Sequence, residues 1–216
     1  MNRPARLAVA ALTVSAALLL TACGSGGGDD SSSDKIKGAD AGSEKTSASP
    51  SAPASQDVAG RPEITLSKDF QANFEGWTNS DPKLQAILDD GREELRSKYA
   101  AIIESNPDSD AVAFYNSGTS LASAREWIKS FTDTDDGLIG KVTVSRPQVH
   151  INDTGAGVLF YCVDERKAST KNRKTGKVTT TPDKPESVLQ YRERLDRNSQ
   201  GVWKNVSLTT VAGGCG

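Results

Sequence analysis

Between residues 81 and 107 the pattern of apolar and polar positions predicts a long helix. Asp81 is a favourable N-cap and Pro82 fits the first helical position. The apolar positions that follow are spaced as on one face of a helix: Leu84, Ile87, Leu88, Leu95, Tyr99, Ile102 and Ile103. Gly91 lies on the same stripe, where a neighbouring element could approach closely. Asn106-Pro107 ends the helix, because the residue before a proline disfavours helical backbone.

Two shorter helices are expected next. The first spans roughly Ser109 to Tyr115 and is stopped by Gly118. Thr119 or Ser120 then caps the second. Its apolar face is formed by Leu121, Ala124, Ile128 and Phe131, beside Trp127.

After Gly137 the apolar period changes from 3.6 to 2, which indicates strands. Val142 and Val144 alternate with polar residues, and the alternation resumes beyond Pro147 at Val149 and Ile151. A proline inside such a run predicts an edge strand or a bulge.

The continuous apolar run from Val158 to Val163 predicts a strand covered on both faces, at the centre of the sheet. Ser187 to Arg197 places Leu189, Tyr191 and Leu195 inward, and Val202 to Val211 forms the last strand. Helices followed by hairpin-connected strands predict an α+β fold, with the N-terminal helices packed on one face of a curved antiparallel sheet.

Residues 64–77 are predicted to form an arm that packs against this domain. Ile64 and Leu66 alternate as in a short strand. Ser67 could then cap a short helix, with Phe70 and Phe74 one turn apart on it. Gly76 would end the helix.

The N-terminus has the layout of a secretory signal. Arg3 and Arg6 precede an apolar run of fourteen residues, from Leu7 to Leu20, and small residues follow it. The alternative, a transmembrane helix, needs roughly 20 apolar residues. The run is too short for that.

Leu20-Thr21-Ala22-Cys23 resembles the lipobox of bacterial lipoproteins. The resemblance implies that residues 1–22 are removed and that the Cys23 thiol carries a diacylglycerol. It places the protein on the extracytoplasmic face of the cell membrane. Residues 23–60 then form a Ser/Gly/Asp-rich tether too poor in apolar residues to offset the entropy of folding, and 61–216 form a single domain.

Charge and cysteine content narrow the possible functions. The net charge of -2 argues against a dedicated nucleic-acid binder. If Cys23 is lipidated, Cys162 and Cys215 remain as a candidate disulfide pair in an oxidising compartment. The cysteines are far apart in sequence and His150 is the only histidine, so we expect neither a metal site nor a cofactor.

A family resemblance covers most of residues 62–216. The helix order, the strand meander and the Gly201 to Lys204 strand start resemble the nuclear-transport-factor-2-like fold, a cystatin-like roll. The lipobox and several short motifs resemble a family of actinobacterial (Streptomyces-type) lipoproteins whose members are generally uncharacterised. Those motifs are Tyr115-Asn116-Ser117-Gly118, Tyr161-Cys162-Val163-Asp164-Glu165, Lys174-Thr175-Gly176 and the closing Gly-Gly-Cys. The broader fold hosts isomerases, cyclases, dehydratases and binding modules, so it selects no activity.

An isomerase-like site in this fold would need a carboxylate base in an apolar cone and a donor such as Tyr. The carboxylates among the early strands are Asp153 in a turn and the adjacent Asp164 and Glu165, which face opposite ways on a strand. Tyr99 and Tyr115 could point into a cone. These residues match no ketosteroid isomerase pattern, and we expect no catalytic site. His150 is predicted to face solvent.

Cations gather in one hairpin region around Lys174-Thr175-Gly176. They are Arg166, Lys167, Lys171, Arg173, Lys174 and Lys177, with Lys184 nearby. One interpretation is a solvated hairpin whose lysines prevent edge-to-edge pairing. The other is a contact with an anionic envelope surface or an acidic partner.

Together these features favour a lipid-anchored, non-catalytic binding or interaction domain of the cell envelope. Two alternatives stay open: an envelope enzyme that uses the cone as its active site, and a structural spacer without a ligand. An open apolar cone with an inward carboxylate and hydroxyl would favour the enzyme. A filled cone would favour the other two.

Overall fold

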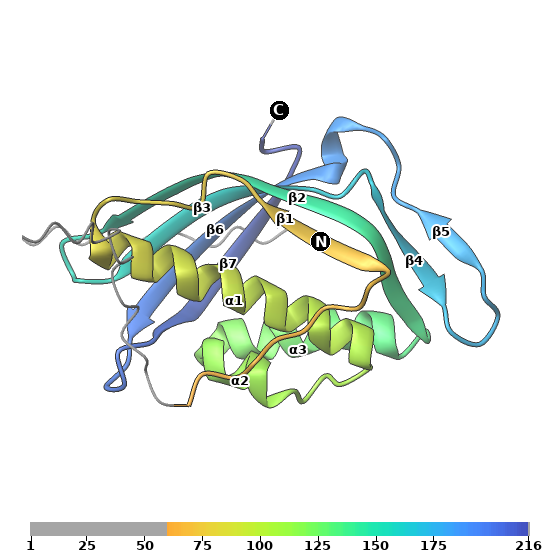
Figure 1. Cartoon of the computed structure of the whole chain (residues 1–216), viewed down its shortest axis with the longest axis horizontal. Coiled ribbons are helices and arrows are strands. Elements are labelled where there is room, and N and C mark those ends of the chain that lie inside the picture. The colour runs from red at the N-terminus through yellow and green to blue at the C-terminus, as the bar shows by residue number, and fades with distance from the viewer. Residues whose placement is uncertain (1–59, 216) are drawn as a thin grey trace, which may run out of the picture. The chain divides into compact units, whose positions relative to one another are not determined.

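Three helices pack on a curved, mostly antiparallel sheet in the computed structural model (Figure 1), which describes residues 60–215. The predicted leader, Cys23 and the predicted tether up to residue 59 lie outside the described residues. Helix α1 (Pro82–Glu104) begins as predicted, since the Asp81 side chain accepts a hydrogen bond from Lys83 N at 2.8 Å. The helix ends at Ser105, which has left-handed backbone with φ 55°.

Helices α2 (Asp110–Tyr115) and α3 (Gly118–Thr132) follow, but the predicted cap of α3 is wrong. Ser117 occupies the N-cap position. The hydroxyls of Thr119 and Ser120 bind other groups, the carbonyl of Val206 at 3.1 Å and the side chain of Asn116 at 2.9 Å. Gly118, expected to stop α2, is the first residue of α3.

The sheet is built around two strands, β2 (Asp136–Ile151) and β3 (Gly157–Asp164). Its order is β5-β4-β2-β3-β6-β7, so β3 lies in the interior as predicted. The remaining strands are β4 (Ala168–Asn172), β5 (Val178–Thr180), β6 (Val188–Arg197) and β7 (Trp203–Ala212), with a short 3-10 helix, Pro185–Ser187, before β6.

Strand β2 pairs with three strands, and its two antiparallel neighbours lie one after the other along its length. Its first part pairs with β4 and its second part with β3, and the register shifts between Ser145 and Gln148. The predicted interruption at Pro147 is therefore a bulge within one continuous strand. Arg146 in this bulge has a left-handed φ of 55°, which is uncommon for a residue other than glycine.

The predicted helix at residues 67–77 is wrong, because Phe70–Phe74 form strand β1. This strand pairs with β2 in parallel, with Phe70 opposite Gly140 and Phe74 opposite Val144. Phe70 is buried and Gln71 and Asn73 are exposed, so the segment also fits a period of two. Residues 64–66, predicted as a strand, form a strap without regular structure, held where Arg96 donates to the carbonyl of Ile64 at 2.7 Å.

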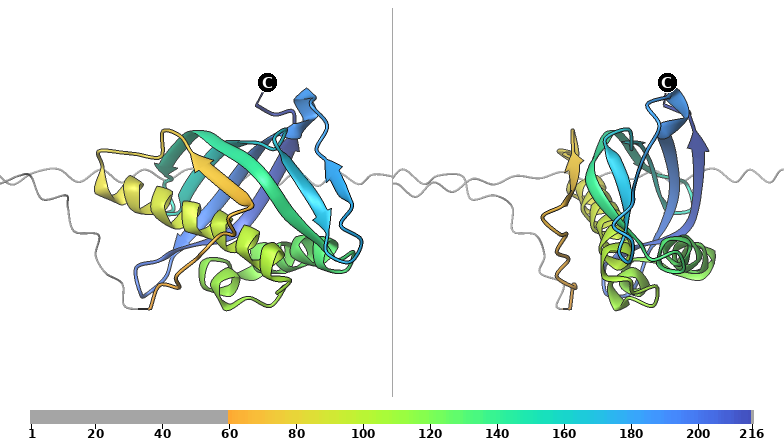
Figure 2. Two further views of the ribbon diagram at one scale, coloured as in Figure 1. Left: turned by 45° about the vertical axis from the view of Figure 1, so that its right-hand side comes forward. Right: turned by 90° about the vertical axis from the view of Figure 1, so that its right-hand side faces the viewer.

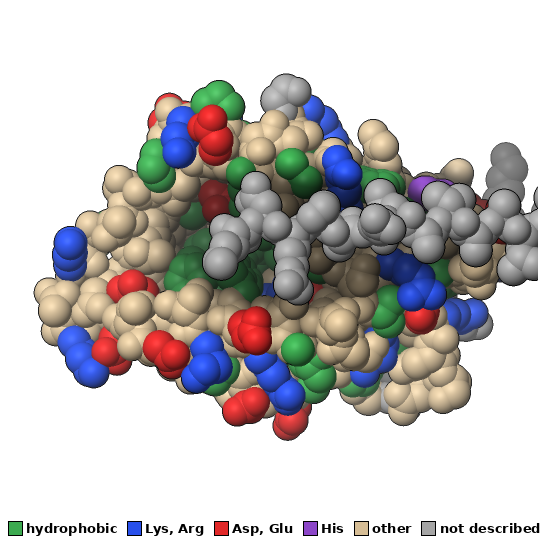
Figure 3. Space-filling view, turned by 180° about the vertical axis from the view of Figure 1, so that it is seen from behind, with side chains coloured by type: hydrophobic (Ala, Val, Ile, Leu, Met, Phe, Trp, Pro, Cys, Tyr) green, Lys and Arg blue, Asp and Glu red, His purple; other side chains and the backbone are tan. Residues whose placement is uncertain are grey.

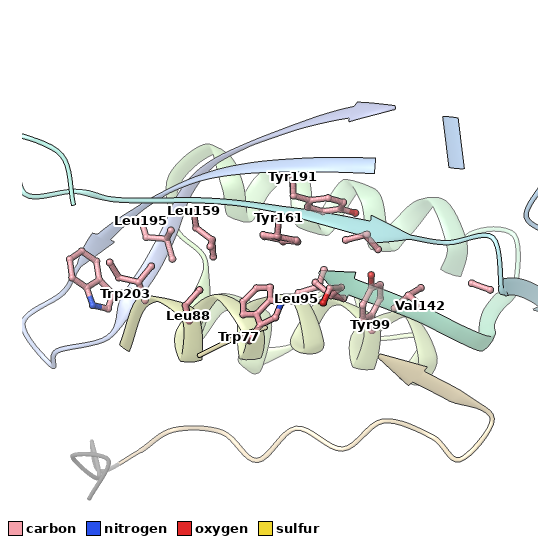
Figure 4. Close-up of a cluster of buried hydrophobic side chains, with 14 of the residues drawn as sticks. Trp77, Leu88, Leu95, Tyr99, Val142, Leu159, Tyr161, Tyr191, Leu195 and Trp203 are labelled. Atoms are coloured by element: carbon pink, nitrogen blue, oxygen red, sulfur yellow. Dashed lines mark hydrogen bonds between the residues drawn. The ribbon is translucent and has the colours of Figure 1, made fainter. Parts of the chain in front are cut away.

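The main core lies between α1 and the sheet and is rich in aromatic side chains (Figure 4). Trp77 packs edge-on to Tyr161 with ring centroids 5.3 Å apart, and Tyr161 stacks on Tyr191 at 5.0 Å. Gly91 faces this core, and a Cβ there would lie 2.6 Å from Leu159 Cδ2, so the predicted close approach is present. A long helix, two short helices and a curled strand meander give the α+β roll expected from the nuclear-transport-factor-2-like resemblance. Figure 2 shows this layering from two further sides.

Candidate functional site

Three ionisable side chains enter the apolar core from α1 and β6. Glu94 is 0% exposed, and Lys98 and Glu193 are each 2% exposed. Lys98 Nζ lies 2.9 Å from Glu94 Oε1, one helical turn away. Within residues 60–215 neither Glu94 oxygen has hydrogen-bond geometry toward a partner, so its contact with Lys98 is an ion pair rather than an aligned hydrogen bond. Charged side chains this deeply buried are rare unless they are paired.

The side chain of Glu193 on β6 is hydrogen-bonded to a tyrosine of the neighbouring strand β3. The Tyr161 hydroxyl donates a hydrogen bond to Glu193 Oε1 at 2.6 Å. Burial, the largest cause, and the charge of Glu94 together raise the pKa of Glu193 to about 8, against the lowering effects of Lys98 and of the Tyr161 hydrogen bond. Burial also raises the pKa of the Tyr161 hydroxyl well above its usual range. Both groups therefore hold their protons at neutral pH, while Lys98 offsets the charge of Glu94.

Two oxygen atoms beside this cluster have no hydrogen-bond partner within residues 60–215. They are Glu193 Oε2 and the hydroxyl of Tyr99. Phe70 packs against the Tyr99 ring at 5.1 Å, so this hydroxyl belongs to the same aromatic core. Buried polar atoms without partners are uncommon, so each of these two atoms is a candidate for a contact with a ligand group.

Sequence reasoning missed Glu94, Lys98 and Glu193, although the signals were present. Glu94 and Lys98 lie three and seven positions after Gly91, on the stripe already assigned to the core. Glu193 lies between Tyr191 and Leu195 in the inward alternation of β6. Glu193 is on β6, late in the chain, whereas the carboxylates considered from the sequence, Asp153, Asp164 and Glu165, belong to the early strands.

The predicted carboxylates do not form a common site. Asp153 is exposed in its turn. Asp164 accepts a hydrogen bond from Arg166 at 2.7 Å, and this bond lowers its pKa. Glu165 is partly buried, and burial raises its pKa to about 6, with a smaller effect of Asp164.

The other predicted candidates also separate. Tyr99 lies in the main core, whereas Tyr115 belongs to a second cluster, where it packs on Phe114 at 4.9 Å. His150 is exposed on β2, as expected. Within residues 60–215 no three His, Cys, Asp or Glu side chains lie together as metal ligands would.

The cone around Glu193 is filled by its own side chains. Trp77, Tyr161 and Tyr191 lie in the buried core (Figure 4), and Glu193, which is bonded to Tyr161, is only 2% exposed. A pocket of about 460 Å³ opens elsewhere, between the strap and β1, with Arg96 in its lining. Figure 3 shows a recess with hydrophobic side chains on its floor, on the face opposite to that of Figure 1. The acid–base groups themselves are 0–2% exposed.

Three of the six cations predicted to contact an anionic surface have partners within the domain itself. Arg166 pairs with Asp164 at 2.7 Å and with Asp183 at 3.4 Å. Lys174 pairs with Asp135 at 2.7 Å.

Arg173 is bound to backbone oxygens. It donates to the carbonyl of Ile102 at 2.6 Å and to that of Asp136 at 2.7 Å, and so caps the C-terminal end of α1. Lys167, Lys171 and Lys177 are exposed and form no ion pair within the described part of the chain.

The predicted pair Cys162 and Cys215 is joined by a disulfide, with Cα atoms 6.0 Å apart. It fastens the C-terminal turn to the outer face of the central strand β3. None of the helices within residues 60–215 combines the length and apolar character that crossing a bilayer requires.

No protein-family model and no curated protein matches this chain. Several solved structures share part of the architecture. A ketosteroid isomerase-like protein from Erwinia carotovora atroseptica is 15% identical, covers 60% of this chain and 95% of its own, and has a TM-score of 0.43. Aln2 from a Streptomyces species is 12% identical, with coverage of 62% and 94% and a TM-score of 0.43.

The intermembrane space region of the chloroplast protein ARC6 is 9% identical, with coverage of 62% and 99% and a TM-score of 0.41. Likeness at this level identifies no activity, ligand or partner for the chain.

Proposed function

We propose that the protein is a lipid-anchored, extracytoplasmic domain that binds an anionic component of the cell envelope at its surface, without catalysis in its cone. The main support for a role without catalysis is that the cone around Glu193 is closed. A substrate could reach Glu193 only by displacing Trp77, Tyr161 or Tyr191 from the packed core. Such large side chains contribute much of the core's burial free energy, so the displacement would be costly.

The charges of the cone also balance without a ligand. Glu94 and Lys98 form an ion pair, and the raised pKa of Glu193 leaves this carboxyl protonated and neutral beside the Tyr161 hydroxyl. The cluster can therefore serve the fold alone.

The anchor rests on the lipobox-like Leu20-Thr21-Ala22-Cys23, which lies outside the described residues. The anionic contact rests on the exposed Lys167, Lys171 and Lys177 of the β4–β5 hairpin. Each exposed cation near an anionic membrane contributes about 1 kcal/mol, so such binding falls steeply with salt.

One membrane preparation tests both the lipid anchor and the absence of a ligand in the cone. The full chain is expressed in a bacterium that processes lipoproteins, purified from membranes and studied by mass spectrometry. We expect an N-terminal peptide that begins at a diacylglycerol-modified Cys23, and a Cys23→Ser protein that no longer sediments with membranes. An unmodified Cys23 would refute the anchor.

Native mass spectrometry of the same sample tests the cone. We expect no stoichiometric small molecule whose binding depends on Glu193. A bound compound that is lost in Glu193→Gln would overturn the non-catalytic assignment.

That outcome would support the second candidate, an envelope enzyme. The Glu193 Oε2 and the Tyr99 hydroxyl favour it, because both are buried without a partner within residues 60–215 and either could form a hydrogen bond with a ligand. The buried carboxyl with a raised pKa would then be the proton donor.

A further inference from the structure

We propose that a pocket on the outer face of the sheet is a phosphate-binding site. It has a volume of about 330 Å³ and lies beside the Cys162–Cys215 disulfide. This inference rests on the proposed function only for the source of the phosphate, which would be a component of the cell envelope. Tyr161 also borders the pocket, but its side chain points into the core, so the polar side chains available in the pocket are those of Arg146, Gln148, Gln190 and Arg192.

Strand register brings these side chains together. Gln148 of β2 is opposite Phe160 of β3, and Phe160 is opposite Arg192 of β6. Tyr161 and Tyr191 point inward to the core, so their neighbours along β3 and β6 point outward. Phe160 thus provides an apolar floor with polar groups on either side.

The bulge in β2 supplies the second arginine. Arg146 has a left-handed backbone, which leaves the regular alternation of the strand. Its guanidinium donates to the carbonyl of Cys215 in the C-terminal turn. Strained backbone at a residue other than glycine is frequent at ligand sites.

The C-terminal turn forms a fixed wall of the pocket. The disulfide joins Cys215 to Cys162 of β3. The turn lies so close to the sheet that a Cβ on Gly214 would be 2.9 Å from Gln190 Cβ. The wall is therefore held covalently and by packing before any ligand arrives.

Donor groups in the pocket exceed the acceptors that the chain supplies. Arg192 donates through Nε to Gln190 Oε1 at 2.6 Å, and its two terminal nitrogens have no partner within residues 60–215. The Gln190 amide nitrogen and the Gln148 side chain also form no hydrogen bond there. The residues that line the pocket include two arginines and no Asp or Glu.

These features fit a phosphate monoester better than a carboxylate. A phosphate monoester carries about -1.5 to -2 charges at pH 7 and three terminal oxygens, which match two guanidinium groups and two amides. A carboxylate would neutralise only one of the two cations.

The test uses inorganic phosphate as the probe and NMR as the readout, at constant ionic strength set with NaCl. The protein is residues 23–216 with Cys23→Ser. We expect saturable shifts of the Phe160, Gln148, Gln190 and Arg192 signals. Arg192→Gln should weaken binding by about tenfold or more, the effect of losing one charge-assisted pair. Arg194→Gln is the matched control: an exposed arginine on the same strand and face, paired with Asp196.

Arg146→Gln should weaken binding to a similar degree, but it also removes the bond to Cys215. Arg192→Gln keeps the test independent of that bond, since the hydrogen bond of the Arg192 side chain within residues 60–215 goes to Gln190. No saturable shift at these residues, or equal weakening by Arg194→Gln, would overturn the proposal.

A second arm identifies the source of the phosphate. Vesicles of phosphatidylcholine with phosphatidic acid are compared with vesicles of equal charge that contain phosphatidylglycerol, a diester. Preference for phosphatidic acid that is lost in Arg192→Gln identifies a lipid headgroup, whereas phosphate binding without this preference identifies a free phosphate compound. Because the protein lacks the lipid anchor, failure of the anchor hypothesis leaves this result unchanged. A double variant, Lys171→Ser with Lys177→Ser, measures how much the general electrostatic attraction of the hairpin contributes to vesicle binding.

Discussion

Asp90 Oδ2 accepts a hydrogen bond from the backbone N–H of Trp203 at 2.8 Å, across 113 positions of sequence. The other oxygen of the same buried carboxylate pairs with Arg61 at the start of the described chain. One side chain on α1 thus connects the strap and the beginning of β7. The helical pattern of α1 gave no reason to single out Asp90.

Asp90→Ala should lower the free energy of unfolding by about 2 kcal/mol, because it leaves the buried Trp203 N–H without an acceptor. Asp90→Asn keeps an acceptor and should cost clearly less. Urea unfolding of both variants measures the difference. Equal losses would show that the charge toward Arg61, rather than the bond to Trp203, stabilises the fold here.

Gly140→Ala should destabilise the domain far more than Gly155→Ala. Both glycines have positive φ, 88° and 80°, so both substitutions carry backbone strain of roughly 1 kcal/mol. A Cβ on Gly140 would also lie 2.5 Å from the carbonyl oxygen of Lys167, whereas nothing lies within 4 Å at Gly155. Thermal unfolding of the two variants compares them, and similar melting temperatures would contradict the close approach of β2 and β4.

Removing the disulfide with Cys162→Ala and Cys215→Ala should cost about 4 kcal/mol, the chain-entropy value for a separation of 53 residues. Reduction of the wild type with dithiothreitol should lower its stability by a similar amount and leave the variant unchanged. Two free thiols in the unfolded, unreduced wild type would contradict the bridge.

Glu193 should make the protein less stable as pH rises. Its pKa increases from 4.5 to about 8 on folding, so between these values the folded chain holds a proton that the unfolded chain has released. Stability is therefore greatest below pH 4.5 for this group and falls through the window up to 8, by up to about 1.4 kcal/mol per pH unit. Unfolding of wild type and Glu193→Gln across this window measures the slope.

In Glu193→Gln the free energy of unfolding should depend less on pH. A smaller decrease should remain below pH 6, because the pKa of Glu165 is raised to about 6. Glu63→Gln, at an exposed position, is the control and should retain the full slope. An unchanged slope in Glu193→Gln would assign the pH dependence to other groups.

Hydrophobic periodicity correctly predicted the helices and strands that are specified by local sequence signals. The Asp81-Pro82 start of α1, the buried β3 and the inward side chains of β6 were all readable because caps and apolar stripes are local signals. Phe70 and Phe74 were misread as one face of a helix, since their spacing of four also fits a strand that alternates with Gln71 and Asn73. Parallel pairing with β2 makes this segment a strand rather than a helix, and a long-range pairing of this kind leaves no signal in the local sequence.

The candidate sites were harder to predict than the fold. Glu193 and Glu94 are distant in sequence and come near each other only because α1 and the inner face of β6 border the same core. Arg146 and Arg192 come together through a bulge and the register of three strands. By contrast, Arg173 was counted as a surface cation, although the fold uses it to cap α1.

The strap has a mechanical consequence for a domain held by its N-terminus. A pull on Gly60 loads the Arg61–Asp90 pair first, and the bond from Arg96 to the Ile64 carbonyl second. Only then does the force reach the β1–β2 ladder at Phe70. Tension would thus be released in steps along the strap, while the disulfide keeps the opposite end of the chain on β3 throughout. If the domain is bound to a fixed surface while its anchor moves, the strap would therefore detach before the strands of the sheet separate.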